Sequence, residues 1–265
     1  MRILAMTCCC VDLFPETGKI LPGGNSLNLA VSCKKAGAEN VYVMGNIGKD
    51  GYGEIVKKAA DKYGINRAGI REIEGQTANH MIHIDEKGDR YFKENSWIGG
   101  VWADWRINAD DEKFMKSMDA VVTTIGEPEF KNIIKIKRDA PFLLSVDFHD
   151  ENINPEWEEY FDAVDLFFIS GKNQNPKKLE EWSKNFNAVF TATLGEFGSV
   201  SFKDGLKYEC NAAKVGKVID TTGCGDSYQG GFIVEYLKSK NIENAMRKGS
   251  ESAAETLSYI GGFEI

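Results

Sequence analysis

The feature that most constrains the fold is a series of short apolar runs that alternate with segments of helical spacing. Residues 53–63, for example, place Ile55, Val56 and Ala59 on one helical face. Strands that alternate with helices favour an α/β fold, with a mostly parallel sheet flanked by helices. We expect strands over residues 3–11, 41–45, 120–124, 142–148, 166–170 and 188–194, and helices over 26–35 and 53–63.

One segment breaks this alternation. Residues 70–97 alternate only partly around the turn DEKGD, a pattern that predicts a β-hairpin. Such an excursion is either a small sheet laid over the main domain as a lid or an ordinary surface hairpin. The sequence has 265 residues without an internal repeat or long linker, so we expect a single domain over residues 1–265.

Composition narrows the class of protein. A formal net charge of −8 argues against a general nucleic-acid or anionic-membrane surface. No apolar run approaches the roughly 18 residues needed to cross a bilayer, and the first residues do not follow the pattern of a secretory signal. The six cysteines form no C-x-x-C pair and are interpreted as small core residues. We therefore expect a cytoplasmic protein with no nucleic-acid or membrane partner.

The stretch DTTGCGDSYQGGF (220–232) places two glycines and an aspartate where helical spacing begins. We expect a short strand over 217–219 and a helix from about Asp226. Gly223 and Gly225 would then lie where free backbone N–H groups and the helix dipole stabilise an anion. Asp226 either caps the helix or takes a proton from a hydroxyl that attacks a phosphoryl group held by those amides.

A second glycine-rich segment, TLGEFGS (193–199), follows an apolar strand. Gly195 and Gly198 would let the backbone approach a ligand closely in a tight turn. The same residues would also suit an ordinary hairpin turn. The segment lacks the G-x-x-x-x-G-K-[ST] pattern, so it is not a P-loop.

A third segment, PGGNSLNLA (22–30), places Asn25 and Asn28 around the first turn of a helix. Asparagines there either cap the helix or present amides to sugar hydroxyls. Asp12 lies near the end of the first strand, where open α/β sheets bind ligands.

These segments, in this order, resemble the ribokinase-like carbohydrate kinases, also called the phosphofructokinase-B family. The resemblance spans nearly the whole chain. It implies a three-layer α/β/α sandwich with a small β-sheet lid from about 12–22 and 70–97, and transfer of the γ-phosphate of ATP to a sugar hydroxyl. The motifs are GGNSLN (23–28), GNIGKDGYG (45–53), TLGEFGS and DTTGCGDS (220–227), the last similar to the family's D-T-x-G-x-G-D signature.

The resemblance also implies residue roles. Asp226 is the base that deprotonates the sugar hydroxyl, and the amides of Gly223, Cys224 and Gly225 form the anion hole. Cys224 replaces a common alanine, with little consequence expected because only its backbone is used. The other implied contacts are Thr193, Gly195 and Gly198 to the nucleotide, Asp12, Gly24, Asn25 and Asn28 to the sugar, and Asp220 and Thr222 to a monovalent cation, K⁺ in some members.

One departure concerns Mg²⁺. Family members usually carry an Asn-x-x-Glu element after a central strand, and this chain has Gly171 and Gln174 at those places. Mg²⁺ should still accompany ATP, since the phosphate charges must be neutralised. How the protein positions the ion is left open.

Some segments resemble the family members that phosphorylate fructosamines: CVDLFP (10–15), GKDGYG (48–53), DR-x-F (89–92) and GVWADW (100–105). They imply phosphorylation of the 6-hydroxyl of fructoselysine or a related fructosamine. Alternatives are a kinase for ribose, fructose or adenosine, and a non-catalytic sugar or nucleotide sensor on the same fold.

Two further points concern a rival class and the quaternary structure. A NAD-dependent oxidoreductase would need G-x-G-x-x-G after the first strand, which residues 7–24 lack. Lid strands could pair edge to edge to form a homodimer.

Overall fold

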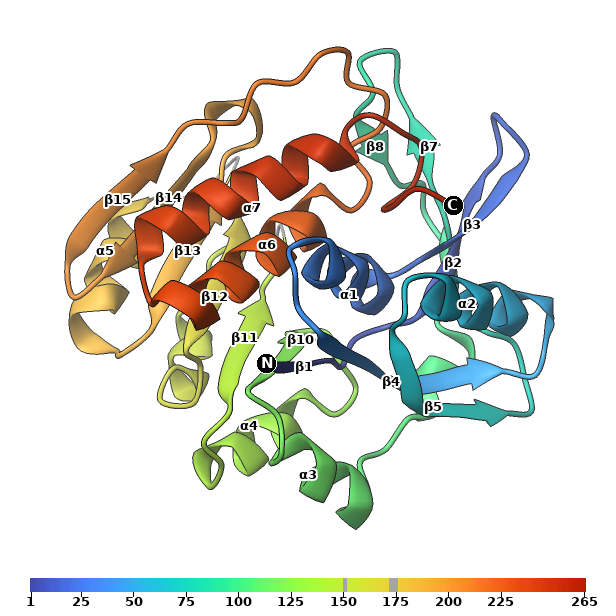
Figure 1. Cartoon of the computed structure of the whole chain (residues 1–265), viewed down its shortest axis with the longest axis horizontal. Helices are drawn as coiled ribbons and strands as arrows, with labels where there is room; N and C mark the ends of the chain where they lie inside the picture. Colours follow the sequence, from blue (N-terminus) through green and yellow to red (C-terminus); the bar gives the residue numbers. More distant parts are fainter. Residues whose placement is uncertain (150–151, 172–175) are drawn as a thin grey trace.

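The computed structural model describes residues 1–149, 152–171 and 176–265, and a nine-stranded sheet forms its centre (Figure 1). The strand order is β15-β14-β13-β12-β11-β10-β1-β4-β5, parallel from β13 to β5 and antiparallel at β14 and β15. These strands are β1 (Arg2–Ala5), β4 (Asn40–Gly48), β5 (Asn66–Ile73), β10 (Ala120–Thr124), β11 (Leu143–Asp147), β12 (Leu166–Ser170), β13 (Val189–Thr193), β14 (Ser199–Lys203) and β15 (Leu206–Cys210).

Helices cover both faces of this sheet, so the predicted three-layer α/β/α sandwich is confirmed. One face carries α1 (Asn25–Lys35), α2 (Gly51–Lys62), α6 (Cys224–Ser239) and α7 (Ile242–Thr256), which lie together in Figure 1. The other carries α3 (Ala109–Met115), α4 (Phe130–Arg138), α5 (Pro176–Asn185) and the 3₁₀ turn η2 (Pro155–Tyr160).

The central strands, such as β10 and β12, are apolar along most of their length because both of their faces are buried, whereas the edge strands β5 and β15 carry exposed charged residues. In β12, Phe167 packs into the core under α4 and α5, and Phe168 into the core under α1 and α6. This alternation follows from the two-residue period of a strand. The strands expected at 120–124 and 166–170 have those bounds in the structure.

A second sheet has the order β3-β2-β6-β9, with a separate β7–β8 pair beside it. Its segments coincide largely with those for which a lid was predicted, but residues 70–73 belong to β5 of the main sheet. A covering role for this second sheet stays a prediction. The bounds are β2 (Cys10–Phe14), β3 (Lys19–Gly23), β6 (Asn79–Met81), β7 (His83–Ile84), β8 (Arg90–Tyr91) and β9 (Trp97–Ile98).

Two predicted strands were wrong. The run at 3–11 is split between β1 and β2, which lie in different sheets. The connection hides this break because its residues, such as Cys8 and Cys9, are as buried as the strands. Residues 217–219 form no strand, and the N–H of Ile219 donates instead to Leu257 O at 2.9 Å.

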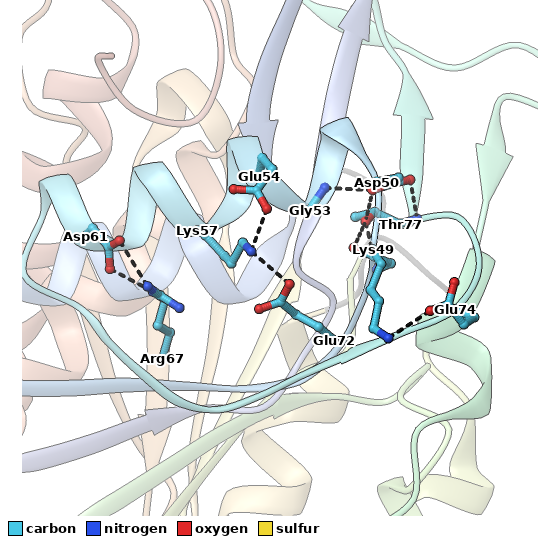
Figure 2. A network of polar contacts seen from close by, with 11 residues as sticks. Lys49, Asp50, Gly53, Glu54, Lys57, Asp61, Arg67, Glu72, Glu74 and Thr77 are labelled. Atoms are coloured by element: carbon cyan, nitrogen blue, oxygen red, sulfur yellow. Dashed lines mark hydrogen bonds and ion pairs between the residues drawn. The ribbon is translucent and has the colours of Figure 1, made fainter.

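The segment GKDGYG links the start of α2 to the residues that precede β6 of the second sheet, as Figure 2 shows. Asp50 caps α2 by accepting a hydrogen bond from Gly53 N at 2.8 Å. Its carboxylate also accepts from Thr77 N at 2.9 Å and Thr77 Oγ1 at 2.6 Å. Asp50 therefore fixes the chain two residues before β6 begins.

Candidate active site

The N-terminus of α6 is built as an open loop. Gly223 is the cap residue with φ 75°, and a Cβ there would lie 2.6 Å from Gly262 Cα. A Cβ at Gly225 would meet open space. The N–H groups of Gly223 and Gly225 have no hydrogen-bond partner among the described residues, whereas Cys224 N donates to Thr221 O at 3.3 Å. Two amides are thus free to bind an anion, and the third makes only a long hydrogen bond.

Asp226 is not the helix cap, because it lies in the first turn, three residues after Gly223. Its carboxylate instead accepts a hydrogen bond from Asn25 Nδ2 and another from Asn28 Nδ2, each at 2.8 Å. Neither asparagine side chain caps α1. The two amides therefore hold the carboxylate in one orientation. Asp226 is buried, with 7% of its surface exposed.

The environment of Asp226 shifts its pKa to about 6. Burial is the largest cause and raises the pKa, and the Asp147 carboxylate raises it further. The hydrogen bonds from Asn28 and Asn25 and the charge of Arg90 act in the opposite direction. A carboxyl group with this pKa is largely ionised at neutral pH and can still accept a proton, as general-base catalysis requires.

The Asp226 side chain lines a small hollow and is therefore not enclosed by protein on all sides. The hollow lies at the carboxyl ends of β1, β10 and β11, where parallel sheets bind ligands. Its polar lining includes Thr7, Asn25, Thr124 and Asp147. Its volume is only about 10 Å³, room for one water-sized group, so a single reacting atom can reach the base but the hollow does not enclose a whole sugar.

Asp12 lies on β2 of the second sheet and is 3% exposed. Burial raises its pKa to about 7; Arg90 opposes this, and Asp226 and Asp220 add to it. A Cβ on Gly23 would lie 2.0 Å from Asp12 Oδ2, and one on Gly24 would lie 2.3 Å from Cys8 O. The two glycines thus allow the start of α1 to lie directly against β2.

The residues predicted to contact the nucleotide cluster at the end of β13. Thr193 ends that strand, and Gly195 opens the 3₁₀ turn η3 (Gly195–Phe197) with φ 61°. A Cβ on Gly198 would lie 2.0 Å from Cys210 O, so this glycine is required by strand packing. Tyr228 Oη donates to Ser199 Oγ at 2.8 Å, which ties this turn to α6.

Asp220 and Thr222 lie together just before α6. Asp220 is fully buried, and its two oxygens accept from Thr222 N and Gly261 N at 2.8 Å each. Thr222 Oγ1 is buried without a hydrogen-bond partner among the described residues. A buried carboxylate beside an orphaned hydroxyl fits a monovalent cation, and no Lys, Arg or His in the described part of the chain forms an ion pair with Asp220.

At Gly171, which takes the place of the asparagine of the Asn-x-x-Glu element, the packing leaves no space for a larger side chain. A Cβ on Gly171 would lie 2.8 Å from both Ala192 Cβ and Leu194 Cδ2, so an asparagine does not fit without movement. Gln174 lies outside the described residues. Among residues 1–149, 152–171 and 176–265 there is no group of three His, Cys, Asp or Glu side chains that could hold a metal.

Sequence reasoning assigned no role to Arg90 and Asp147. Arg90 lies on β8, and its charge lowers the pKa values of both Asp12 and Asp226. The β7–β8 pair is tied to the loop before α6, because Arg90 N donates to Thr221 Oγ1 at 3.1 Å. The DR-x-F motif marked this segment, but no sequence signal brings it to residue 221.

The chain belongs to the pfkB family of carbohydrate kinases, whose family model matches residues 14–137 and 155–264. This confirms the predicted family and makes the chain an ATP-dependent sugar kinase. No helix in the described part of the chain is long and apolar enough to span a membrane.

Two relatives match almost end to end. The chain is 28% identical over 260 residues to fructoselysine 6-kinase of Escherichia coli (strain K12), covering 96% of each protein. It is 26% identical over 274 residues to the fructosamine kinase of Bacillus subtilis (strain 168), covering 99% of this chain and 93% of that protein.

The fold has solved counterparts. Arabidopsis thaliana ribokinase, complexed with ribose and ATP, superposes with a TM-score of 0.84 at 20% identity, covering 98% of this chain and 93% of the ribokinase. The ribokinase-like fold predicted from the sequence is thereby confirmed.

Proposed function

We propose that this kinase transfers the γ-phosphate of ATP to the 6-hydroxyl of fructoselysine or a related fructosamine. The observation that carries the catalytic part is the position of Asp226, held by Asn25 and Asn28 beside the free amides of Gly223 and Gly225. The substrate rests on the similarity to the two relatives that act on fructosamines.

In the proposed reaction, Asp226 accepts the proton of the sugar hydroxyl as the hydroxyl oxygen attacks the γ-phosphorus. The bond from that phosphorus to the bridging oxygen breaks, and ADP leaves with the electron pair. The amides at the start of α6 stabilise the charge of the phosphoryl group during transfer. Asp12, Gly24, Asn25 and Asn28 hold the sugar, and Thr193, Gly195 and Gly198 lie at the nucleotide. Asn25 and Asn28 would then both orient the base and contact the substrate.

Mg²⁺ bound with ATP would neutralise the phosphate charges. Asp147 lines the same hollow as Asp226 and suits an ion that takes one or two carboxylates together with phosphate oxygens. Asp220 and Thr222 would hold a monovalent cation such as K⁺ near the anion-binding loop, which the orphaned Thr222 hydroxyl supports.

Replacing Asp226 with Asn tests the catalytic proposal. The amide keeps the shape of the side chain but cannot accept the proton, so turnover should fall about 10²-fold or more. Binding of MgATP and sugar, measured by calorimetry, should change little. An unchanged turnover would remove Asp226 from the mechanism and favour a different base.

A substrate panel tests the acceptor. ADP release is measured with fructoselysine, ribose, fructose and adenosine at matched concentrations. We expect the highest kcat/KM with fructoselysine. A clear preference for a free sugar or a nucleoside would overturn the fructosamine assignment, and no activity on any of them would favour a non-catalytic sensor.

A further inference from the structure

Glu127 is a buried carboxylate to which the proposed reaction gives no role. It is 5% exposed and lies three residues after β10. Among the described residues its oxygens accept hydrogen bonds only from Trp102 Nε1, at 3.2 and 3.4 Å, and no Lys, Arg or His pairs with it. A buried carboxylate without a cation is costly, so a cationic ligand would stabilise it.

The electrostatic surroundings agree with this geometry. Burial raises the pKa of Glu127 to about 8, the indole hydrogen bond lowers it only in part, and the neighbouring Glu129 carboxylate raises it further. Glu127 is therefore largely protonated at neutral pH in the free protein, and a cationic ligand would stabilise its ionised form. Glu129 itself is already satisfied, by Ile107 N at 3.2 Å and Asn132 Nδ2 at 2.7 Å. Of the two carboxyl groups, Glu127 is therefore the one with unused capacity to accept hydrogen bonds from a ligand.

Glu127 also lies next to the reaction site. Thr123 and Thr124, at the end of β10, line the hollow that contains Asp226. The next residues of the chain, Ile125 and Glu127, line a larger hollow of about 370 Å³. Both hollows thus lie near the carboxyl end of β10, and the charges of Glu127 and Asp12 both act to raise the pKa of Cys8, which places Glu127 near the predicted sugar contacts. The larger hollow has the volume of a small-molecule site.

The lining of the larger hollow suits an amino-acid side chain with charged ends. Phe130, Trp157 and Tyr160 give it apolar surface. Lys131 lies on its rim and makes no ion pair with any described residue. Glu156 and Glu159 line it as well, so three carboxyl groups and the Lys131 cation surround the aromatic surface.

Resting on the proposed fructosamine substrate, we propose that this hollow receives the amino-acid part of the substrate, with Glu127 facing the secondary ammonium and Lys131 the carboxylate. Trp102, which comes from the GVWADW segment, holds the Glu127 side chain in position. Glu127 and Lys131 would then determine substrate specificity, and neither takes part in phosphoryl transfer.

The test compares Glu127→Gln with wild type on three acceptors. These are fructoselysine, the fructosamine of n-butylamine, which has the ammonium but no carboxylate, and fructose, which has neither. Gln keeps an acceptor for Trp102 but loses the charge. We expect KM for both fructosamines to rise about tenfold or more, as for loss of a charged hydrogen bond, with kcat and the KM for fructose little changed.

Lys131→Met separates the two contacts. In this variant the KM for fructoselysine should rise, because the contact to the carboxylate is lost. The KM for the butylamine derivative, which has no carboxylate, should stay at the wild-type value. Glu129→Gln is the matched control, since it removes a neighbouring buried carboxylate that does not line the hollow. It should leave the KM for each fructosamine, relative to the KM for fructose, at the wild-type ratio.

Thermal stabilisation checks that the variants are folded. Glu127→Gln should keep its Tm increase with MgATP and lose most of the increase with fructoselysine. Equal KM values for wild type and Glu127→Gln on the fructosamines would overturn this inference while leaving the proposed function standing. A wild-type enzyme inactive on both fructosamines would overturn the fructosamine function itself, and this inference with it.

Discussion

At the scale of single residues, the site depends on a carboxylate whose protonation is set by its neighbours. Asp226 is buried, and two asparagine amides oppose the effect of burial on its pKa. The same balance recurs at Asp12, where Arg90 is the opposing group. The charge state of these side chains should therefore be visible in the pH dependence of the reaction.

We expect kcat to fall below a pH of about 6, because protonated Asp226 cannot act as a base. The pKa is raised above the ordinary aspartate value, so the active ionised form is lost earlier on acidification than for an exposed carboxyl. Initial rates between pH 5 and 8 at saturating substrate measure this limb. An Asp12→Asn variant should retain it, and a profile flat to pH 5 would contradict the assignment.

Cys224→Ala should leave activity within about twofold of wild type, since the reaction would use only the backbone at this position. Burial raises the pKa of the thiol to about 12, so it stays protonated and poorly reactive at neutral pH. Steady-state kinetics before and after mild oxidation provide the measurement. A loss of tenfold or more would show that the side chain has a role.

At the scale of elements, short polar contacts fix where the strands and helices begin. Asp50 joins the first turn of α2 to the residue that leads into β6. Burial acts to raise the pKa of Asp50, but the hydrogen bonds from Thr77 and Gly53 outweigh it, so the pKa is lowered. The stability this gives is present at neutral pH and lost as the pH falls through the folded-state pKa.

Asp50→Ala should reduce the free energy of unfolding by about 1–2 kcal/mol, as for loss of a helix cap. Urea denaturation at pH 7 measures it, and the difference should shrink towards pH 3. Glu54→Ala on the same helix is the control. The Glu54 side chain is exposed and Lys57 keeps its second ion pair with Glu72, so this change should cost no more than about 0.5 kcal/mol.

At the scale of the whole molecule, the second sheet exposes apolar side chains that the main domain does not cover. Ile20 on β3 and Ile98 on β9 are each 46% exposed, and these are the two edge strands of that sheet. Met81, Tyr91, Phe92 and Trp97 are exposed nearby. Unpaired edges with apolar side chains favour association with another copy.

We therefore expect a homodimer through the second sheet at micromolar concentration, measured by sedimentation velocity. Ile20→Glu and Ile98→Glu should each shift the protein to monomer, because the charge would be buried in the interface. Leu206→Glu is the matched control, since Leu206 is 61% exposed on β15 at the edge of the main sheet. A monomeric wild type would refute the prediction.

The sequence alone was sufficient for the order of the main elements, the three-layer fold and the family. Strand and helix periodicity are local properties, so runs such as 120–124 and 166–170 were recognised without any tertiary information. The glycine-rich loop before α6 could also be predicted from the sequence, because the spacing of a loop motif is a local property too.

Only the tertiary structure decided what surrounds those motifs. It showed that Asn25 and Asn28 hold Asp226, about two hundred residues away in the chain. It also showed that burial raises the pKa of Asp226, with smaller effects of opposite sign from Asp147 and Arg90. It also divided the first apolar run between two sheets, and it buried Glu127 with Trp102 as its hydrogen-bond partner and no ion pair to any described residue. Contacts between distant residues depend on how the layers pack. Apolar periodicity indicates only local secondary structure, so it does not predict those contacts.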